Sequence, residues 1–168
     1  MRFDKYEKEA LTYSYKALKR NVPLWVSRLD DIKCLLQASV KKYVPFDTAY
    51  IDFPDELECY DSLSFRFGKC VEIAIHFFGS LELFTFAKQS DTLRDRLLVM
   101  QKINIIGEID FWMEARLLRN KIAHAYLPEE IKDIYQEIHD SSQEIFNTID
   151  RIKNYLAEQA KKEKDEQK

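Results

Sequence analysis

The spacing of apolar side chains is helical over most of this chain. Between residues 55 and 127, a stretch without proline, one stripe advances by three or four residues at a time: Leu57, Tyr60, Ser64, Phe67, Val71, Ala74, Phe78 and Leu81. This spacing predicts a long helix from Asp55 to Leu81. Gly68 and Gly79 lie inside it, and each costs roughly 1 kcal/mol relative to alanine, which predicts close packing or a break near Gly79.

Three further helices are predicted after the polar patch Lys88–Asp91. The first runs from Leu93 to about Asn104, and after a turn to Gly107 the second runs from about Glu108 into the low 120s. The third begins at Pro128, because proline suits the first turn of a helix. Its apolar positions repeat every seven residues and predict a bundle helix of about seven turns: Ile131, Ile138, Ile145 and Ile152, with Ile134, Ile149 and Leu156 beside them.

The first fifty residues are predicted to add two helices. Tyr6–Leu18 and Leu24–Val44 are both amphipathic, and Asn21-Val22-Pro23 separates them. Residues 45–54, PFDTAYIDFP, read as a loop with exposed aromatic side chains, and the charged residues 157–168 as a disordered tail. The prediction is therefore one all-α domain over residues 1–156. It is an up-and-down helical bundle with a four-helix core at 55–156 and two extra N-terminal helices in an extension over residues 1–50.

Composition excludes several protein classes. The chain has 168 residues, enough for one hydrophobic core, and only 3 Gly and 4 Pro, too few for a turn-rich β-sandwich. The glycine-rich loops that bind phosphate in kinases, P-loop ATPases and dinucleotide oxidoreductases cannot be written in this sequence. The net charge is −3, so contact with nucleic acid would need a local basic patch.

Cysteine and histidine spacing predicts a protein without a metal or cofactor. The three cysteines, Cys34, Cys59 and Cys70, form no C-x-x-C pair and are typical of reduced thiols in the cytoplasm. The three histidines form no H-x-x-x-H pair, so no metal-ligand set is recognisable. An apolar signal core is missing from the first ten residues, and no apolar run approaches 18 residues, so we expect a cytoplasmic protein without a membrane span.

One segment concentrates side chains suited to phosphodiester chemistry. Arg116, Arg119, Asn120, His124 and Tyr126 lie within eleven residues. Arginine makes bidentate hydrogen bonds to phosphate oxygens and stabilises the charge that develops there. Histidine, whose imidazole titrates near neutrality, takes a proton from a hydroxyl or gives one to a leaving oxygen.

This segment resembles the signature of the HEPN superfamily (higher eukaryotes and prokaryotes nucleotide-binding). Arg119-Asn120-x-x-x-His124-x-Tyr126 is similar to the R-N-x-x-x-H and R-x4-H-x-Y motifs of HepT-like toxins and the related nucleotidyltransferase substrate-binding proteins. Phe65-Arg66-Phe67 with Glu72 resembles that family's R-F-x-x-x-x-E segment, and the run from Gly107 through Trp112 to Arg119-Asn120 resembles its G-x-I-x-x-x-x-W run. The likeness spans about residues 55–156, and the first fifty residues have no counterpart.

The resemblance implies a four-helix core that forms a homodimer, with the motifs of two subunits facing one cleft. It implies a metal-independent ribonuclease in which Arg119 holds the phosphate, His124 moves the proton and Asn120 fixes the local geometry. It also implies a toxin whose partner, a small nucleotidyltransferase antitoxin, adds adenylate to Tyr126. Arg116, Lys121 and Trp112 are candidate RNA contacts, and Trp112 is alternatively a residue of the dimer seam.

Helical geometry bears on how this site is completed. On one regular helix Arg119 and Tyr126 lie ~20° apart, whereas His124 lies ~140° from Arg119. Either a helix end near Pro128 brings His124 round, or a second subunit completes the site. Two other functions stay open: a non-catalytic companion subunit of a nucleotidyltransferase, and a structural bundle in which Arg119 caps carbonyls and His124 is a satisfied polar residue.

Overall fold

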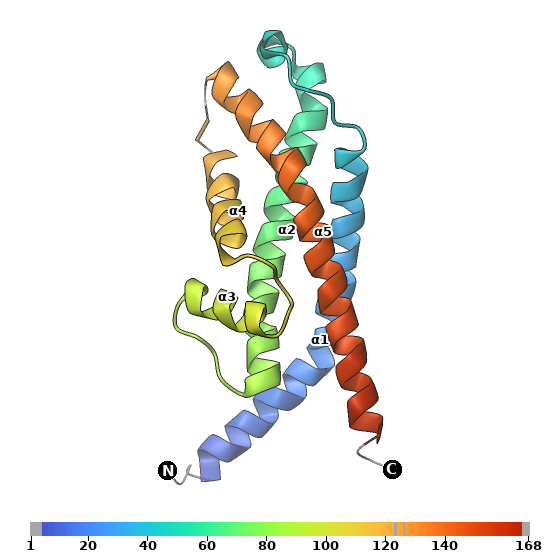
Figure 1. Ribbon diagram of the computed structural model, residues 1–168, viewed down its shortest axis with the longest axis vertical. Coiled ribbons are helices and arrows are strands. Elements are labelled where there is room, and N and C mark those ends of the chain that lie inside the picture. The colour runs from blue at the N-terminus through green and yellow to red at the C-terminus, as the bar shows by residue number, and fades with distance from the viewer. Residues whose placement is uncertain (1–4, 123, 126, 166–168) are drawn as a thin grey trace.

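Helices make up all the regular structure of the described residues. The computed structural model describes residues 5–122, 124–125 and 127–165, and of residues 5–19 and 163 the backbone only. Helices α1, α2, α4 and α5 alternate in direction along the long axis, and the short α3 lies across them (Figure 1). This confirms the predicted all-α up-and-down bundle. The elements are α1 (Lys5–Val40), the 3₁₀ helix η1 (Thr48–Asp52), α2 (Pro54–Phe86), α3 (Leu93–Lys102), α4 (Ile109–Ile122) and α5 (Pro128–Asp165).

The N-terminal segment forms one helix, where the sequence predicts two. Pro23 lies inside α1, and a proline there removes one backbone hydrogen bond and bends the helix rather than ending it. Figure 1 shows α1 changing direction where it leaves the bundle. Leu29, Ile32 and Leu36 share one face and are buried against α2 and α5. The second half of α1 is therefore part of the hydrophobic core.

The loop between α1 and α2 closes one end of this core. Phe46 is buried, with its ring 5.0 Å from that of Tyr60 and 5.2 Å from that of Tyr135. The Tyr60 hydroxyl donates to the Val44 carbonyl at 3.1 Å. Only part of the predicted exposed aromatic set is exposed, because Phe46 fills the space between α2 and α5 while Phe53 lies in solvent.

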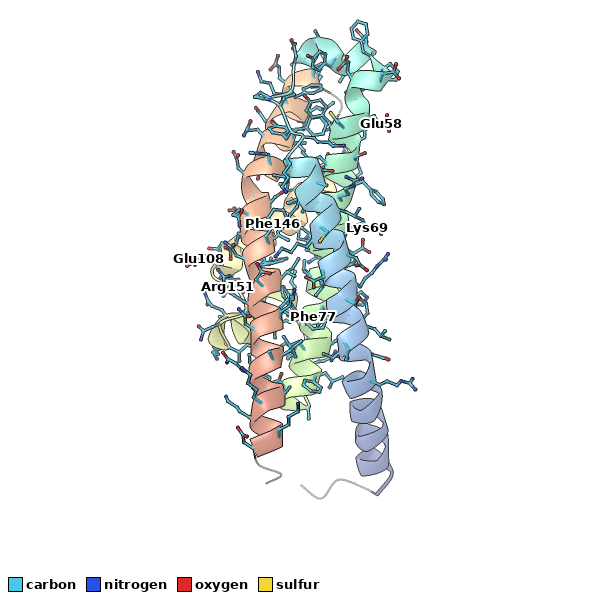
Figure 2. The ribbon with its side chains drawn as sticks, turned by 90° about the vertical axis from the view of Figure 1, so that its right-hand side faces the viewer. Glu58, Lys69, Phe77, Glu108, Phe146 and Arg151 are labelled. Carbon is cyan, nitrogen blue, oxygen red and sulfur yellow. The ribbon has the colours of Figure 1, made fainter. Side chains whose placement is uncertain are left out.

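Helix α2 lies in the middle of the bundle and runs unbroken through Gly68 and Gly79. Pro54 occupies its first turn, and Ala87 ends it in the left-handed conformation with its N–H on the Leu83 carbonyl. Figure 2 shows Phe77 of α2 and Phe146 of α5 between the helices, and both are buried. Of the two alternatives predicted at Gly79, the break is absent and the close packing is present, since a Cβ there would lie 3.2 Å from Arg96 Cζ.

A buried polar network fastens α3 to α2. The Glu82 carboxylate is almost fully buried and accepts hydrogen bonds from the backbone N–H and hydroxyl of Ser90. Arg96 Nε lies 3.5 Å from Glu82 Oε2, and Gly79 leaves room for its guanidinium. Thr92 caps α3 by accepting the Asp95 N–H at 3.1 Å.

Helix α5 buries most of the predicted stripe: Ile138, Ile145, Ile149 and Ile152 are fully buried, whereas Ile131 and Leu156 are half-buried. It continues beyond the predicted end at Leu156 to Asp165. Residues 157–165 are mostly alanine, glutamate, glutamine and lysine, strong helix formers that extend an existing helix at little cost. No helix within the described ranges is both long and apolar enough to cross a bilayer.

Candidate functional site

The buried face of α4 fixes the orientation of the motif. Trp112, Ala115 and Leu118 are buried, and the Trp112 ring meets Phe78 of α2 edge-on at 4.9 Å. The side chain of Trp112 is fully enclosed by its own chain. Both roles predicted for Trp112, an RNA contact and a dimer-seam residue, are therefore wrong, because its turn of α4 faces the core.

Arg119 lies on the same helical stripe as Trp112, two turns further along, where Gly68 leaves a gap beside α2. A Cβ built on Gly68 would lie 3.3 Å from Arg119 Cγ, so the arginine stem packs against the α2 backbone. Its Nη2 lies 3.6 Å from Glu72 Oε2, and its Nη1 donates to Asn120 Oδ1 at 3.2 Å. The side chain keeps 40% exposure, so the guanidinium is positioned and still accessible.

Glu72 holds two cations on this side of α2. It accepts from Lys69 Nζ at 3.3 Å as well as facing Arg119. Glu72 belongs to the R-F-x-x-x-x-E segment, but sequence spacing does not indicate that it contacts Arg119. The arginine of that segment points elsewhere, since Arg66 Nη1 donates to Ser39 Oγ of α1 at 2.6 Å.

Helix α4 ends at Ile122, before His124. His124 lies in a turn, is exposed, and donates its backbone N–H to the Lys121 carbonyl at 2.9 Å. Sequence analysis left two ways to complete the site, a helix end before His124 or a second subunit. The helix end is present, so the angles calculated for one regular helix apply only as far as Ile122. Tyr126, the predicted adenylation site, lies outside the described residues. Asn120 is exposed, and so are Arg116 and Lys121, which are therefore available as the RNA contacts predicted for them.

The other two histidines lie away from this segment. His76 is exposed, although it lies between apolar residues, and its ring lies 6.0 Å from that of Trp25. His139 stacks on Tyr43 at 4.5 Å, and its Nδ1 lies 3.0 Å from Asp140 Oδ1. Hydrogen bonds from His139 and Gln136 hold the pKa of Asp140 below its usual value. In the part of the chain that the structure describes, His, Cys, Asp and Glu do not gather into a group that would hold a metal.

A cavity of about 380 Å³ lies beside the second half of the motif, which sequence analysis did not predict. Its polar groups are the Asp61 carboxylate, the Tyr135 hydroxyl 3.5 Å from Asp61 Oδ1, and the Ser64 hydroxyl. Ser64 Oγ is buried and has no hydrogen-bond partner among the described residues. Burial, and next the charge of Asp61, raise the pKa of Tyr135. The lining residues are Ile51, Leu57, Asp61, Ser64, Phe65, Ile122, Ala125, Ile131, Ile134 and Tyr135.

The cavity and the Arg119 contact share one face of α2. Asp61, Ser64 or Phe65, Gly68 and Glu72 follow one another at steps of three or four residues, which is the repeat of a helical stripe. This spacing is the one sequence signal that indicates the cavity. Ser64 lies one turn, ~6 Å of helix rise, from the glycine beneath Arg119.

Comparison with known proteins adds no relative: no family model, no curated protein and no solved structure matches this chain. The likeness to the HEPN superfamily therefore rests on the motif residues alone.

Proposed function

We propose that this protein is a HEPN-type, metal-independent ribonuclease toxin that a partner nucleotidyltransferase holds in check. The observation that carries the proposal is the placement of the motif. Arg119 is held at the surface by Gly68, Glu72 and Asn120, and His124 is exposed just beyond the end of the same helix. In the structural alternative Arg119 would cap backbone carbonyls, whereas among the described residues its guanidinium faces the side chains of Glu72 and Asn120.

The chemistry assigns one task to each residue. His124 accepts the proton of a ribose 2′-hydroxyl, whose oxygen attacks the adjacent phosphorus. The bond from phosphorus to the 5′-oxygen breaks, that oxygen takes up a proton, and the upstream product ends in a 2′,3′-cyclic phosphate. Arg119 binds the non-bridging oxygens and stabilises their growing charge. Asn120 orients the guanidinium through its Oδ1.

Control by the partner acts on Tyr126 in this proposal. Adenylate added to its phenol would bring a phosphate to the segment that carries Arg119, where it competes with RNA phosphate, and a base that blocks entry. Two copies of the chain form a homodimer in the cytoplasm, and their motifs face a common cleft. These partners follow from the family resemblance.

One observation favours a second function, that of a non-catalytic companion subunit of a nucleotidyltransferase. The Glu72 carboxylate faces Arg119 at 3.6 Å and offsets the charge that would attract RNA. The net charge of −3 acts in the same direction. In that case the protein binds the nucleotidyltransferase and does not cleave RNA.

Paired substitutions test the proposal. Arg119→Ala and His124→Ala should each lower RNA cleavage by about 100-fold or more and abolish growth arrest, with the far-UV circular dichroism unchanged. Arg94→Ala and His139→Ala are the matched controls, because Arg94 is an exposed arginine of α3 and His139 belongs to α5. Equal cleavage by all four variants would contradict the proposal. Binding of the nucleotidyltransferase without cleavage by the wild type would favour the companion subunit.

A further inference from the structure

We infer that the cavity between α2 and the start of α5 is a binding site for a guanine base. Only one part of this inference depends on the proposed function: that the bound guanine belongs to an RNA substrate. The occupancy of the cavity by a free nucleoside is a separate question, and it can be measured without any cleavage.

The walls of the cavity suit a flat, largely apolar ligand. Leu57, Ile122, Ile131 and Ile134 contribute aliphatic surface, and the volume of about 380 Å³ lies within the range of small-molecule sites. The Phe65 ring lines the cavity and is 66% exposed, which makes it an open surface for stacking. Aromatic side chains at such positions stack on bases of single-stranded RNA.

The polar groups of the cavity select for hydrogen-bond donors on the ligand. The Asp61 carboxylate only accepts hydrogen bonds when ionised, and the Tyr135 hydroxyl 3.5 Å away uses part of that capacity. Within the part of the chain that the structure describes, the Ser64 hydroxyl is buried without a partner. A buried polar group is destabilising until a ligand or another group forms a hydrogen bond with it. A purely apolar ligand would leave the Ser64 hydroxyl unpaired.

Guanine satisfies these groups better than the other bases. Its Watson–Crick edge carries two neighbouring donors, N1–H and the 2-amino group, which both fit one carboxylate. Adenine and cytosine place a ring nitrogen acceptor beside their amino group, and uracil places a carbonyl on each side of its single N–H. In these three bases an acceptor would face Asp61. The 6-oxygen of guanine and its neighbouring ring nitrogen N7 are acceptors for the Ser64 hydroxyl.

The position of the cavity fits a base attached to the phosphate that Arg119 would hold. Ser64 and Gly68 are neighbours at i, i+4 on the face of α2 that carries the Arg119 contact. Ile122 and Ala125, which flank the motif histidine in sequence, line the cavity. Guanine bound here would therefore lie beside the motif, and cleavage would favour RNA with guanine next to the broken bond.

Titration of the full-length protein with guanosine, followed by calorimetry, tests this inference. Guanosine should bind, and inosine, which lacks the 2-amino group, should bind about tenfold more weakly, with adenosine weaker still. Asp61→Asn should weaken guanosine binding by about tenfold or more. The matched control is Glu58→Gln, an exposed acid on α2 that does not line this cavity (Figure 2). Ser64→Ala should weaken binding while the melting temperature stays equal or rises, because it removes an unpaired buried hydroxyl.

Three results would overturn the inference: no guanosine binding at millimolar concentration, equal binding of guanosine and adenosine, or equal affinity in the Asp61→Asn and Glu58→Gln variants. Arg119→Ala should leave guanosine binding unchanged, because a nucleoside has no phosphate. Guanosine binding together with cleavage that survives Arg119→Ala would refute the ribonuclease and keep the guanine site. Cleavage that depends on Arg119, together with no binding of guanosine, would refute the guanine site and leave the ribonuclease proposal standing.

Discussion

The two glycines inside α2 should respond in opposite directions to the same substitution, alanine. Both positions are helical, and replacing glycine by alanine in a helix interior gains roughly 1 kcal/mol when nothing else changes. What differs is the side chain that the new methyl group meets. At Gly79 it meets the guanidinium of Arg96, and at Gly68 it meets the stem of Arg119.

At Gly79 the neighbour is held in place. A Cβ there would lie 3.2 Å from Arg96 Cζ and 3.3 Å from its Nε. Arg96 faces the buried Glu82 carboxylate at 3.5 Å and donates to the Ser90 carbonyl at 3.4 Å, so it cannot move without loosening both contacts. Overpacking costs about 1–3 kcal/mol, and the weaker Glu82 contact adds about 1 kcal/mol. After the helical gain, Gly79→Ala should lower the free energy of unfolding by about 1–3 kcal/mol.

At Gly68 the neighbour is free to yield. The Cβ would lie 3.3 Å from Arg119 Cγ, an atom of a flexible side chain that is 40% exposed. A shift of a few tenths of an ångström removes the close contact, so most of the helical gain remains. Gly68→Ala should therefore raise the free energy of unfolding by about 0.5–1 kcal/mol.

Urea denaturation followed by circular dichroism at 222 nm measures both changes on one scale. For a chain of this size each kcal/mol also moves the melting temperature by about 2–4 °C, which gives a second readout. An increase in stability for Gly79→Ala, or equal shifts for both variants, would refute the argument that the Glu82–Arg96 network holds the arginine in place.

Three further predictions concern a buried thiol, the partner enzyme and the oligomeric state. Burial raises the pKa of the Cys70 thiol to about 12. The thiol of the unfolded chain ionises near pH 9.0, so stability is complete below that pH and falls as pH rises toward 12, by about 1.4 kcal/mol at pH 10. Urea titrations at pH 8 and pH 10 under reducing conditions measure this loss, and an unchanged pH dependence in Cys70→Val would contradict it. Co-expression with the nucleotidyltransferase should add the mass of adenylate to the wild type but not to Tyr126→Phe, as measured by intact-mass spectrometry. The Tyr126→Phe variant should still cleave RNA. An unmodified wild type in an inhibited complex would mean that the partner acts by occlusion. Light scattering should give the mass of a dimer, and a strict monomer at micromolar concentration would remove the shared cleft.

Most of the fold is predictable because long helices repeat one signal many times. The stripes of α2 and α5 advance by three or four residues over many turns, so a single exception such as Ser64 does not hide them. The two segments of α1 carry the same signal, but Pro23 reads as a break. It bends the helix instead, because Leu29, Ile32 and Leu36 bury one continuous face beyond it and hold the second half in place.

The site is less predictable, because contacts between helices depend on register and not on spacing along one helix. Arg119 packs beside Gly68 and faces Glu72, and both residues belong to another helix. Trp112 shares the stripe of Arg119 but meets Phe78, so one stripe holds a core residue and a surface residue. The same limit hides the cavity, whose walls come from α2, α5 and the ends of two other elements.

The ends of the RNA products test the central claim most directly. Purified wild-type protein, incubated with RNA in the presence of EDTA, should leave 2′,3′-cyclic phosphate ends. Arg119→Ala and His124→Ala should leave none above background, while Arg94→Ala and His139→Ala should match the wild type. Cleavage that disappears with EDTA, or cyclic phosphate ends that persist in both motif variants, would contradict the assignment of these residues.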